Sequence, residues 1–220
     1  MLFYVKQHAQ TAVLTMIGLL LLSNAWAGLR NIPLGDSVWL DLPTVIAVIM
    51  GLALSASIDG MIYLGNWVVG FRPFLNAFDA SFGKLFAQVS IPAIFTGGML
   101  AALGEETFFR GILQAEWGLL PVAVIFALAH AGRGLNLLTA WALIEGLLFG
   151  WLYQTTGNLF VPMVVHGFHD TAGMFFGRFL YKRFIPPADT LYDWVHKLTT
   201  STAPAAPAPG PTNSTPQADE

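Results

Sequence analysis

The stretch GEETFFRG, residues 104–111, decides how this chain is interpreted, because it places two adjacent carboxylates and a guanidinium inside an apolar region. AIFTGGMLAAL precedes it and ILQAEWGLLPVAVIFALA follows it. An unpaired charge at the centre of a bilayer costs at least about 2.5–3.5 kcal/mol on insertion scales. If these surroundings are lipid, Glu105, Glu106 and Arg110 need partners or a function.

The composition is that of a membrane protein. Of the 220 residues, 55% are hydrophobic and 10% are charged, against roughly 25% charged in soluble domains. A soluble helical protein would need more polar surface than ten Lys and Arg and thirteen Asp and Glu supply. The apolar runs are near the ~20 residues that a helix needs to cross a bilayer. They predict spans at 11–29, 42–64, 91–117, 118–131 (short), 135–155 and 158–180.

We therefore predict an all-α fold, a polytopic transmembrane helical bundle of about six spans. Residues 1–80 form the N-terminal spans, 81–185 a core that contains four helices, 186–198 an interfacial helix and 199–220 a disordered tail. The tail is rich in Pro, Ala, Thr and Ser, and such a composition cannot bury enough apolar area to offset chain entropy.

The amino terminus has two interpretations. Lys6 before an apolar run, with Ala25 and Ala27 at a possible cleavage site, resembles a signal peptide. The same segment is equally an uncleaved first anchor, which the single Lys favours. Basic residues then fall mainly on the inner side, which predicts a multi-pass protein of the inner (plasma) membrane with both termini cytoplasmic.

Charge and cysteine content exclude several function classes. The net charge is -3 and no basic run is present, so nucleic acid is not a predicted partner. Without cysteine, the chain has no disulfide, no thiolate zinc site and no cysteine nucleophile. The expected partners are the lipid bilayer and a peptide or membrane-protein substrate.

Within the first polar group, helical spacing separates the two glutamates. Glu106 and Arg110 are four residues apart and face each other on a helix, in the favoured order. Glu105 projects about 100° away, and a carboxylate without a full partner suits a general base or acid. The alternative is that both glutamates hold Arg110 and clamp helices together.

Three histidines add imidazoles to this set. Phe126 and His130 share a helix face, at a point where the chain leaves the span, so that His130 is expected near water or at the floor of a cavity. His166 and Asp170 are also four apart and share a face. His169 either flanks that face or points elsewhere. Polar groups at membrane depth are candidates for function.

These motifs resemble those of the CAAX protease and bacteriocin-processing family of intramembrane endopeptidases, also called type II CAAX prenyl endopeptidase-like. EETFFR (105–110) is similar to its E-E-x-x-x-R motif, FALAH (126–130) to F-x-x-x-H, and HGFHD (166–170) to H-x-x-x-N or H-x-x-x-D. The resemblance covers about residues 85–180. It implies a membrane-embedded endopeptidase, a hydrolase with a four-helix catalytic core in segment 81–185.

The resemblance also implies residue roles. Glu105 would be the general base that activates a water, assisted by His130, while His166 and Asp170 would stabilise the oxyanion. Glu106 and Arg110 would support them. Where the eukaryotic relative has Asn, this chain has Asp170, which is either protonated or orients His166.

Phe126, Glu145 and His169 are further candidates for the cavity lining. Glu145 belongs to no motif and either pairs with Arg133 or a histidine or lines the cavity. The expected mechanism needs no cofactor and no metal. Two alternatives stay open: a zinc-dependent membrane metalloprotease, since two His and a Glu form a legitimate zinc set, and a non-catalytic membrane partner or immunity protein.

Overall fold

A computed structural model describes residues 2–68, 88–131 and 137–180, together with 74, 78, 82 and 84–86 between them. In this part of the chain all regular structure is helical, which confirms the all-α prediction. The predicted interfacial helix 186–198, the predicted tail 199–220 and Arg133 lie outside the described residues.

The helices follow the apolar runs of the sequence. α1 is Leu2–Arg30, the 3-10 helix η1 is Leu34–Ser37, α2 is Leu42–Val68 and the short α4 is Lys84–Phe86. One continuous rod contains α5 (Ile91–Glu106), the π-helix η3 (Thr107–Gln114) and α6 (Ala115–Trp117). α7 is Leu119–Ala129, α8 is Leu137–Thr156, and α9 (Phe160–Phe175) continues into the π-helix η4 (Phe176–Leu180).

Three segments are long and apolar enough by themselves to cross a membrane: Gln10–Arg30, Leu42–Ile62 and Leu137–Thr156. The predicted third and sixth spans are divided between α and π segments, and α7 has only 11 residues. The number of crossings, about six, therefore stays approximate. The chain is nonetheless a membrane protein by its apolar helices.

The outer faces of α1 and α2 are apolar. Their exposed side chains include Leu14, Ile17, Leu21, Leu22, Ile46, Ile49, Met50 and Leu54. Soluble monomers rarely expose contiguous apolar faces of this kind. Lipid is the environment that such faces fit.

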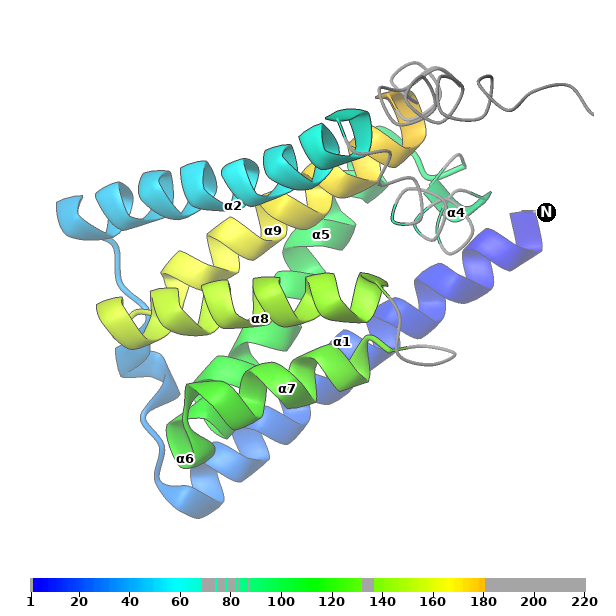
Figure 1. Ribbon diagram of the computed structural model, residues 1–220. Coiled ribbons are helices and arrows are strands. Elements are labelled where there is room, and N and C mark those ends of the chain that lie inside the picture. The colour runs from blue at the N-terminus through cyan, green and yellow to red at the C-terminus, as the bar shows by residue number, and fades with distance from the viewer. Residues whose placement is uncertain are drawn as a thin grey trace, which may run out of the picture.

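The helix connections gather on two opposite sides of the bundle (Figure 1). η1, α6 and the α8–α9 turn lie on one side, and the start of α1 lies on the other with α4. On the first side, Glu116 accepts hydrogen bonds from Trp26 Nε1 (3.1 Å) and Arg30 Nε (2.8 Å), which tie α1 to α6.

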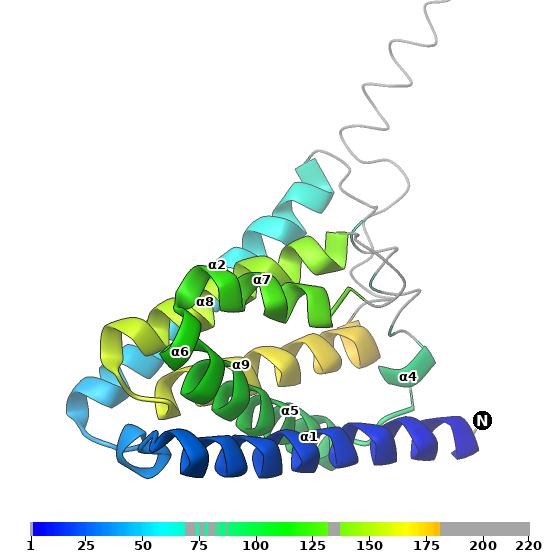
Figure 2. The same ribbon diagram turned by 90° about the horizontal axis from the view of Figure 1, so that it is seen from below.

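α9 is the central helix of the site and packs between α2 and α5 (Figure 1). α5 packs in turn against α1, which runs along one side of the bundle (Figure 2). Two glycines allow α5 and α9 to approach closely. A Cβ atom at Gly98 would lie 2.6 Å from Thr171 Oγ1 and 2.8 Å from the Gly167 carbonyl, and one at Gly167 would lie 2.7 Å from Met99 Sδ. This close approach brings the acidic end of α5 to the histidines of α9.

A buried asparagine fixes the start of α9. Asn158 donates through Nδ2 to the Trp39 carbonyl and to Thr44 Oγ1, both at 2.9 Å, and its Oδ1 accepts from the Phe160 amide at 3.0 Å. The α8–α9 turn is thereby bound to the start of α2. The preceding Gly157 has φ +66°, a backbone angle that glycine adopts without strain.

Candidate active site

Glu106 is the centre of a buried charge network. Its Oε1 accepts from Arg110 Nη1 at 3.1 Å and from His166 Nδ1 at 2.7 Å. Glu106 and Arg110 are fully buried and His166 is nearly so. The predicted pair of Glu106 with Arg110 is confirmed, but the bond to His166 was not predicted, because it joins residues sixty positions apart.

The second end of the Arg110 guanidinium is also held. Arg110 Nη2 donates to the Gly146 carbonyl at 2.9 Å, and Cζ lies 4.6 Å from the centroid of the Phe126 ring. One turn further along η3, Gln114 Nε2 donates to the Gly150 carbonyl at 2.8 Å. Charge-assisted hydrogen bonds and a cation–π contact together compensate for burying this cation.

The hydrogen bonds from Arg110 and Gln114 of η3 to backbone carbonyls of α8 depend on glycines of α8. A Cβ at Gly150 would lie 2.7 Å from Gln114 Oε1, and one at Gly146 would lie 3.1 Å from the Phe126 ring. Gly146 and Gly150 form a G-x-x-x-G pattern, which in membrane helices marks close helix contacts. That pattern was the available signal in the sequence for this helix contact.

Glu105 and His130 come together, as the sequence predicts. Glu105 Oε2 lies 3.7 Å from His130 Nε2, with side-chain exposures of 13% and 41%. His130 caps the end of α7, which agrees with its predicted place where the chain leaves the span. Its Nδ1 lies 2.8 Å from the Phe126 carbonyl. A carbonyl only accepts, so Nδ1 carries the hydrogen and Nε2 faces Glu105.

His166 and Asp170 share one face of α9, again as predicted. His166 Nε2 lies 3.5 Å from Asp170 Oδ2, while Nδ1 is bound to Glu106. Both nitrogens of the ring therefore face a carboxylate. The Phe149 ring stacks on the His166 ring, with centroids 4.6 Å apart and planes 16° apart. The imidazole is thus fixed by its two carboxylates and by one aromatic face.

Phe126 joins the two halves of this group. Its ring centroid lies 4.4 Å from that of His130 and 6.1 Å from that of His166. Phe126, a candidate from the sequence for the cavity lining, thus contacts both histidine rings. In all, seven predicted residues meet in one region of the bundle: Glu105, Glu106, Arg110, Phe126, His130, His166 and Asp170.

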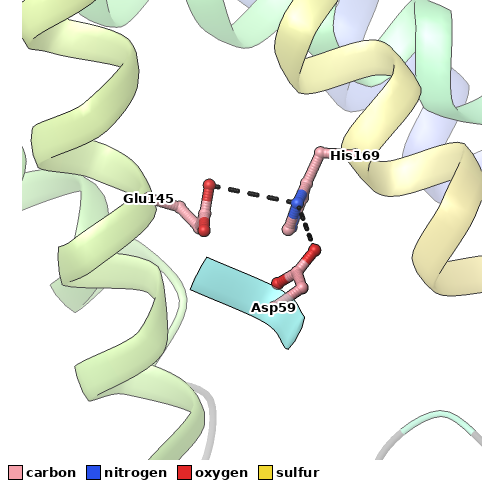
Figure 3. A group of neighbouring side chains, drawn as sticks. All are labelled: Asp59, Glu145 and His169. Atoms are coloured by element: carbon pink, nitrogen blue, oxygen red, sulfur yellow. Dashed lines mark ion pairs between the residues drawn. The ribbon is translucent and has the colours of Figure 1, made fainter. Parts of the chain in front are cut away.

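His169 and Glu145 lie in a second group, with Asp59 of α2 (Figure 3). His169 Nδ1 is 3.2 Å from Asp59 Oδ2 and 3.9 Å from Glu145 Oε2. His169 therefore points away from the His166–Asp170 face, and Glu145 pairs with a histidine, which decides two alternatives that the sequence left open. Asp59 was missed, and a single acid near the end of an apolar run was its only signal.

These two groups differ in their fitness for a metal. Asp59, Glu145 and His169 each offer one ligand atom, and these atoms all lie within 4.8 Å of one another. Of the residues that the structure describes, no other set of three His or acidic residues does so. His130 and His166, the two histidines of the zinc set considered from the sequence, belong to no such set among the described residues.

Comparison with known proteins identifies the segment that carries the motifs. Residues 87–172 match the family model described as type II CAAX prenyl endopeptidase Rce1-like. The chain is 41% identical over 88 residues to "Uncharacterized protein YpbD" of Bacillus subtilis (strain 168), a match that covers 38% of this chain and 44% of that protein. It is 33% identical over 132 residues to an "Uncharacterized 24.3 kDa protein" of Escherichia coli, covering 53% of this chain and 60% of that protein.

The matches thus span about half the length of these two curated relatives. No solved structure matches the chain. The family segment runs from just before α5 into α9 and contains every residue of the Glu106 network. Residues 87–172 of this membrane protein are accordingly similar to the Rce1-like family of type II CAAX prenyl endopeptidases.

Proposed function

We propose that this protein is an intramembrane endopeptidase of the glutamic type, which hydrolyses peptide bonds with a water activated by Glu105 and His130. The observation that carries the proposal is the 3.7 Å separation of Glu105 Oε2 from His130 Nε2. It is too long for a direct hydrogen bond, yet one water can contact both atoms at about 2.8 Å. The match of residues 87–172 to a family model of endopeptidases supports the same assignment.

The first chemical step is attack by that water. Glu105 takes one proton of the water, and the oxygen forms a bond to the carbonyl carbon of the peptide. His130 holds the water through Nε2, because its Nδ1–H is committed to the Phe126 carbonyl. The electron pair of the C=O double bond moves to the oxygen. When the intermediate collapses, the C–N bond breaks and the proton on Glu105 passes to the leaving nitrogen.

The developing oxyanion needs a donor, and His166 supplies it. An imidazolium with both nitrogens between Glu106 and Asp170 has a hydrogen on each, so Nε2–H is available to a substrate oxygen. The 3.5 Å gap to Asp170 Oδ2 exceeds a normal hydrogen bond, so this N–H is not committed to Asp170. Asp170 then orients His166 and balances its charge. One such donor is typically worth about 2.7–4 kcal/mol in the transition state.

The finer assignments are part of the proposal. The substrate is a peptide or a membrane protein that reaches the site from the lipid, and the segment 81–185 is the catalytic core. The protein lies in the inner (plasma) membrane with both termini cytoplasmic, which the distribution of basic residues supports.

The test is a comparison of membrane proteomes from cells that carry the wild type or Glu105→Gln. The substitution removes the base but keeps the shape of the side chain. Uncleaved precursors are expected to accumulate with Glu105→Gln and to be cleaved by purified wild-type protein in lipid. Glu116→Gln is the matched control, since Glu116 lies on α6 outside the site and its ion pair with Arg30 is partly exposed.

Two results would count against the proposal. Unchanged proteomes, with Glu105→Gln folded and expressed, would favour the non-catalytic membrane partner or immunity protein. Sustained loss of cleavage after dialysis against a strong chelator, with recovery on adding zinc, would favour the metalloprotease.

A further inference from the structure

Glu145 is a buried carboxylate with no hydrogen bond to account for it. It is only 3% exposed, and neither of its oxygens has a hydrogen-bond partner among the described residues. Its side chain projects from α8 toward His169 and Asp59, as Figure 3 shows. The contact at 3.9 Å to His169 Nδ1 is an ion pair without a hydrogen bond. Buried polar groups are normally satisfied, so this one needs an explanation.

The charges of the group also do not balance. Asp59 and Glu145 contribute two negative charges when ionised, and a protonated His169 offsets one of them. A net negative charge at membrane depth is costly. A divalent cation bound to both carboxylates and to a neutral imidazole would bring the net charge of the group to zero.

The positions of the ligand atoms fit such an ion. Ligand atoms about 2.0–2.1 Å from a tetrahedral zinc lie about 3.3 Å from one another. His169 Nδ1 is 3.2 Å from Asp59 Oδ2 and 3.9 Å from Glu145 Oε2. Small side-chain movements therefore suffice to enclose an ion. Ser55 Oγ, 3.0 Å from the same nitrogen, adds a third oxygen near this edge of the ring.

An ion also has access to this group. The Asp59 side chain is 41% exposed. Asp59 and His169 line a cavity of about 620 Å³ whose other walls include Phe74, Phe168 and Trp141. The cavity leaves room for water at a fourth coordination position. The Trp141 ring, 5.0 Å from that of His169, holds the imidazole from one side.

We propose that Asp59, Glu145 and His169 form a binding site for a divalent transition metal, with zinc as the best match. One imidazole nitrogen and two carboxylates suit zinc, whereas calcium and magnesium prefer shells made entirely of oxygen. The site differs from the peptidase centre and does not depend on the proposed reaction. Phe149 lies against both histidines, with its centroid 4.6 Å from that of His166 and 6.0 Å from that of His169.

The experiment is a zinc titration of the full chain, purified in detergent and stripped with a chelator, followed by calorimetry and by metal content after gel filtration. The wild type is expected to bind about one Zn²⁺ per chain. Glu145→Gln and Asp59→Asn remove a ligand each and keep the side-chain shape. Each should weaken binding by more than the roughly 10–100-fold that loss of an outer-shell partner costs. Co²⁺ in place of zinc gives a visible absorption band that reports the ligand set.

Glu105→Gln is the matched control, because it removes an acid of the Glu106 region and leaves the Asp59 group intact. It should bind zinc like the wild type. Two outcomes would overturn the proposal: no saturable zinc binding by the wild type, or binding that is lost in Glu105→Gln and kept in Glu145→Gln. Should Glu145→Gln aggregate, Asp59→Asn decides the question, since the Asp59 side chain is 41% exposed.

Discussion

Replacing Glu106 by Ala should destabilise the protein strongly, whereas the same replacement of the adjacent Glu105 should leave the fold intact. Glu106 Oε1 accepts from Arg110 Nη1 at 3.1 Å and from His166 Nδ1 at 2.7 Å. Glu106→Ala would leave the Arg110 guanidinium buried without its anion. Glu105 Oε2 lies 3.7 Å from His130 Nε2 and makes no hydrogen bond to any described residue.

The expected magnitudes follow from these contacts. Breaking a buried ion pair from one side typically costs about 3–5 kcal/mol, because the other charge stays buried. Two charge-assisted hydrogen bonds at about 1.5–3 kcal/mol each give a similar sum. In a chain of this size each kcal/mol lowers Tm by about 2–4 °C, so that Glu106→Ala should lower Tm by about 6–20 °C. Glu105→Ala should change the unfolding free energy by no more than about 1 kcal/mol.

The assay is thermal unfolding of both variants in the same detergent, followed by circular dichroism and gel filtration, together with cleavage of a precursor. Glu105→Ala should be folded and inactive, and Glu106→Ala should be unstable. Equal losses of Tm in the two variants, or a Glu106→Ala protein as stable as the wild type, would refute the division between a supporting and a reactive glutamate.

Three further predictions concern packing, pH and the Arg110 network. Gly98→Val should cost about 1–3 kcal/mol by forcing α5 away from α9, while Gly18→Val, where a Cβ would meet nothing within 4 Å, should leave Tm nearly unchanged. Two hydrogen bonds from Thr44 lower the pKa of Asp41 below 3.8. The contribution of Asp41 to stability is therefore present above about pH 4 and is lost as pH falls through the folded-state pKa. Asp41→Asn should remove this part of the pH dependence of Tm. Arg110→Lys keeps the charge, but an ammonium group cannot bond both Glu106 and the Gly146 carbonyl as the planar guanidinium does. The Tm of this variant should fall clearly below that of the wild type. An unchanged Tm would contradict the role given to the guanidinium.

The contacts that were predictable from sequence are local ones. Glu106 with Arg110 and His166 with Asp170 are each four residues apart, and helix geometry alone places such side chains on one face. The end of α7 at His130 was also readable, since the apolar run stops there. The three motifs were matched as patterns, and the family segment 87–172 covers all of them.

The sequence by itself therefore determined the membrane setting, the approximate bounds of the helices and the side-chain pairs within each helix. Apolar run length and the helical period are properties of consecutive residues, which is why these features were predictable. Only the tertiary structure decided that Glu106 joins Arg110 to His166 and that Asp59, Glu145 and His169 form a separate group. These contacts depend on how each helix is rotated against its neighbours. The rotation is set by close approaches at glycines such as Gly98 and by the π-helix η3, neither of which helical spacing predicts.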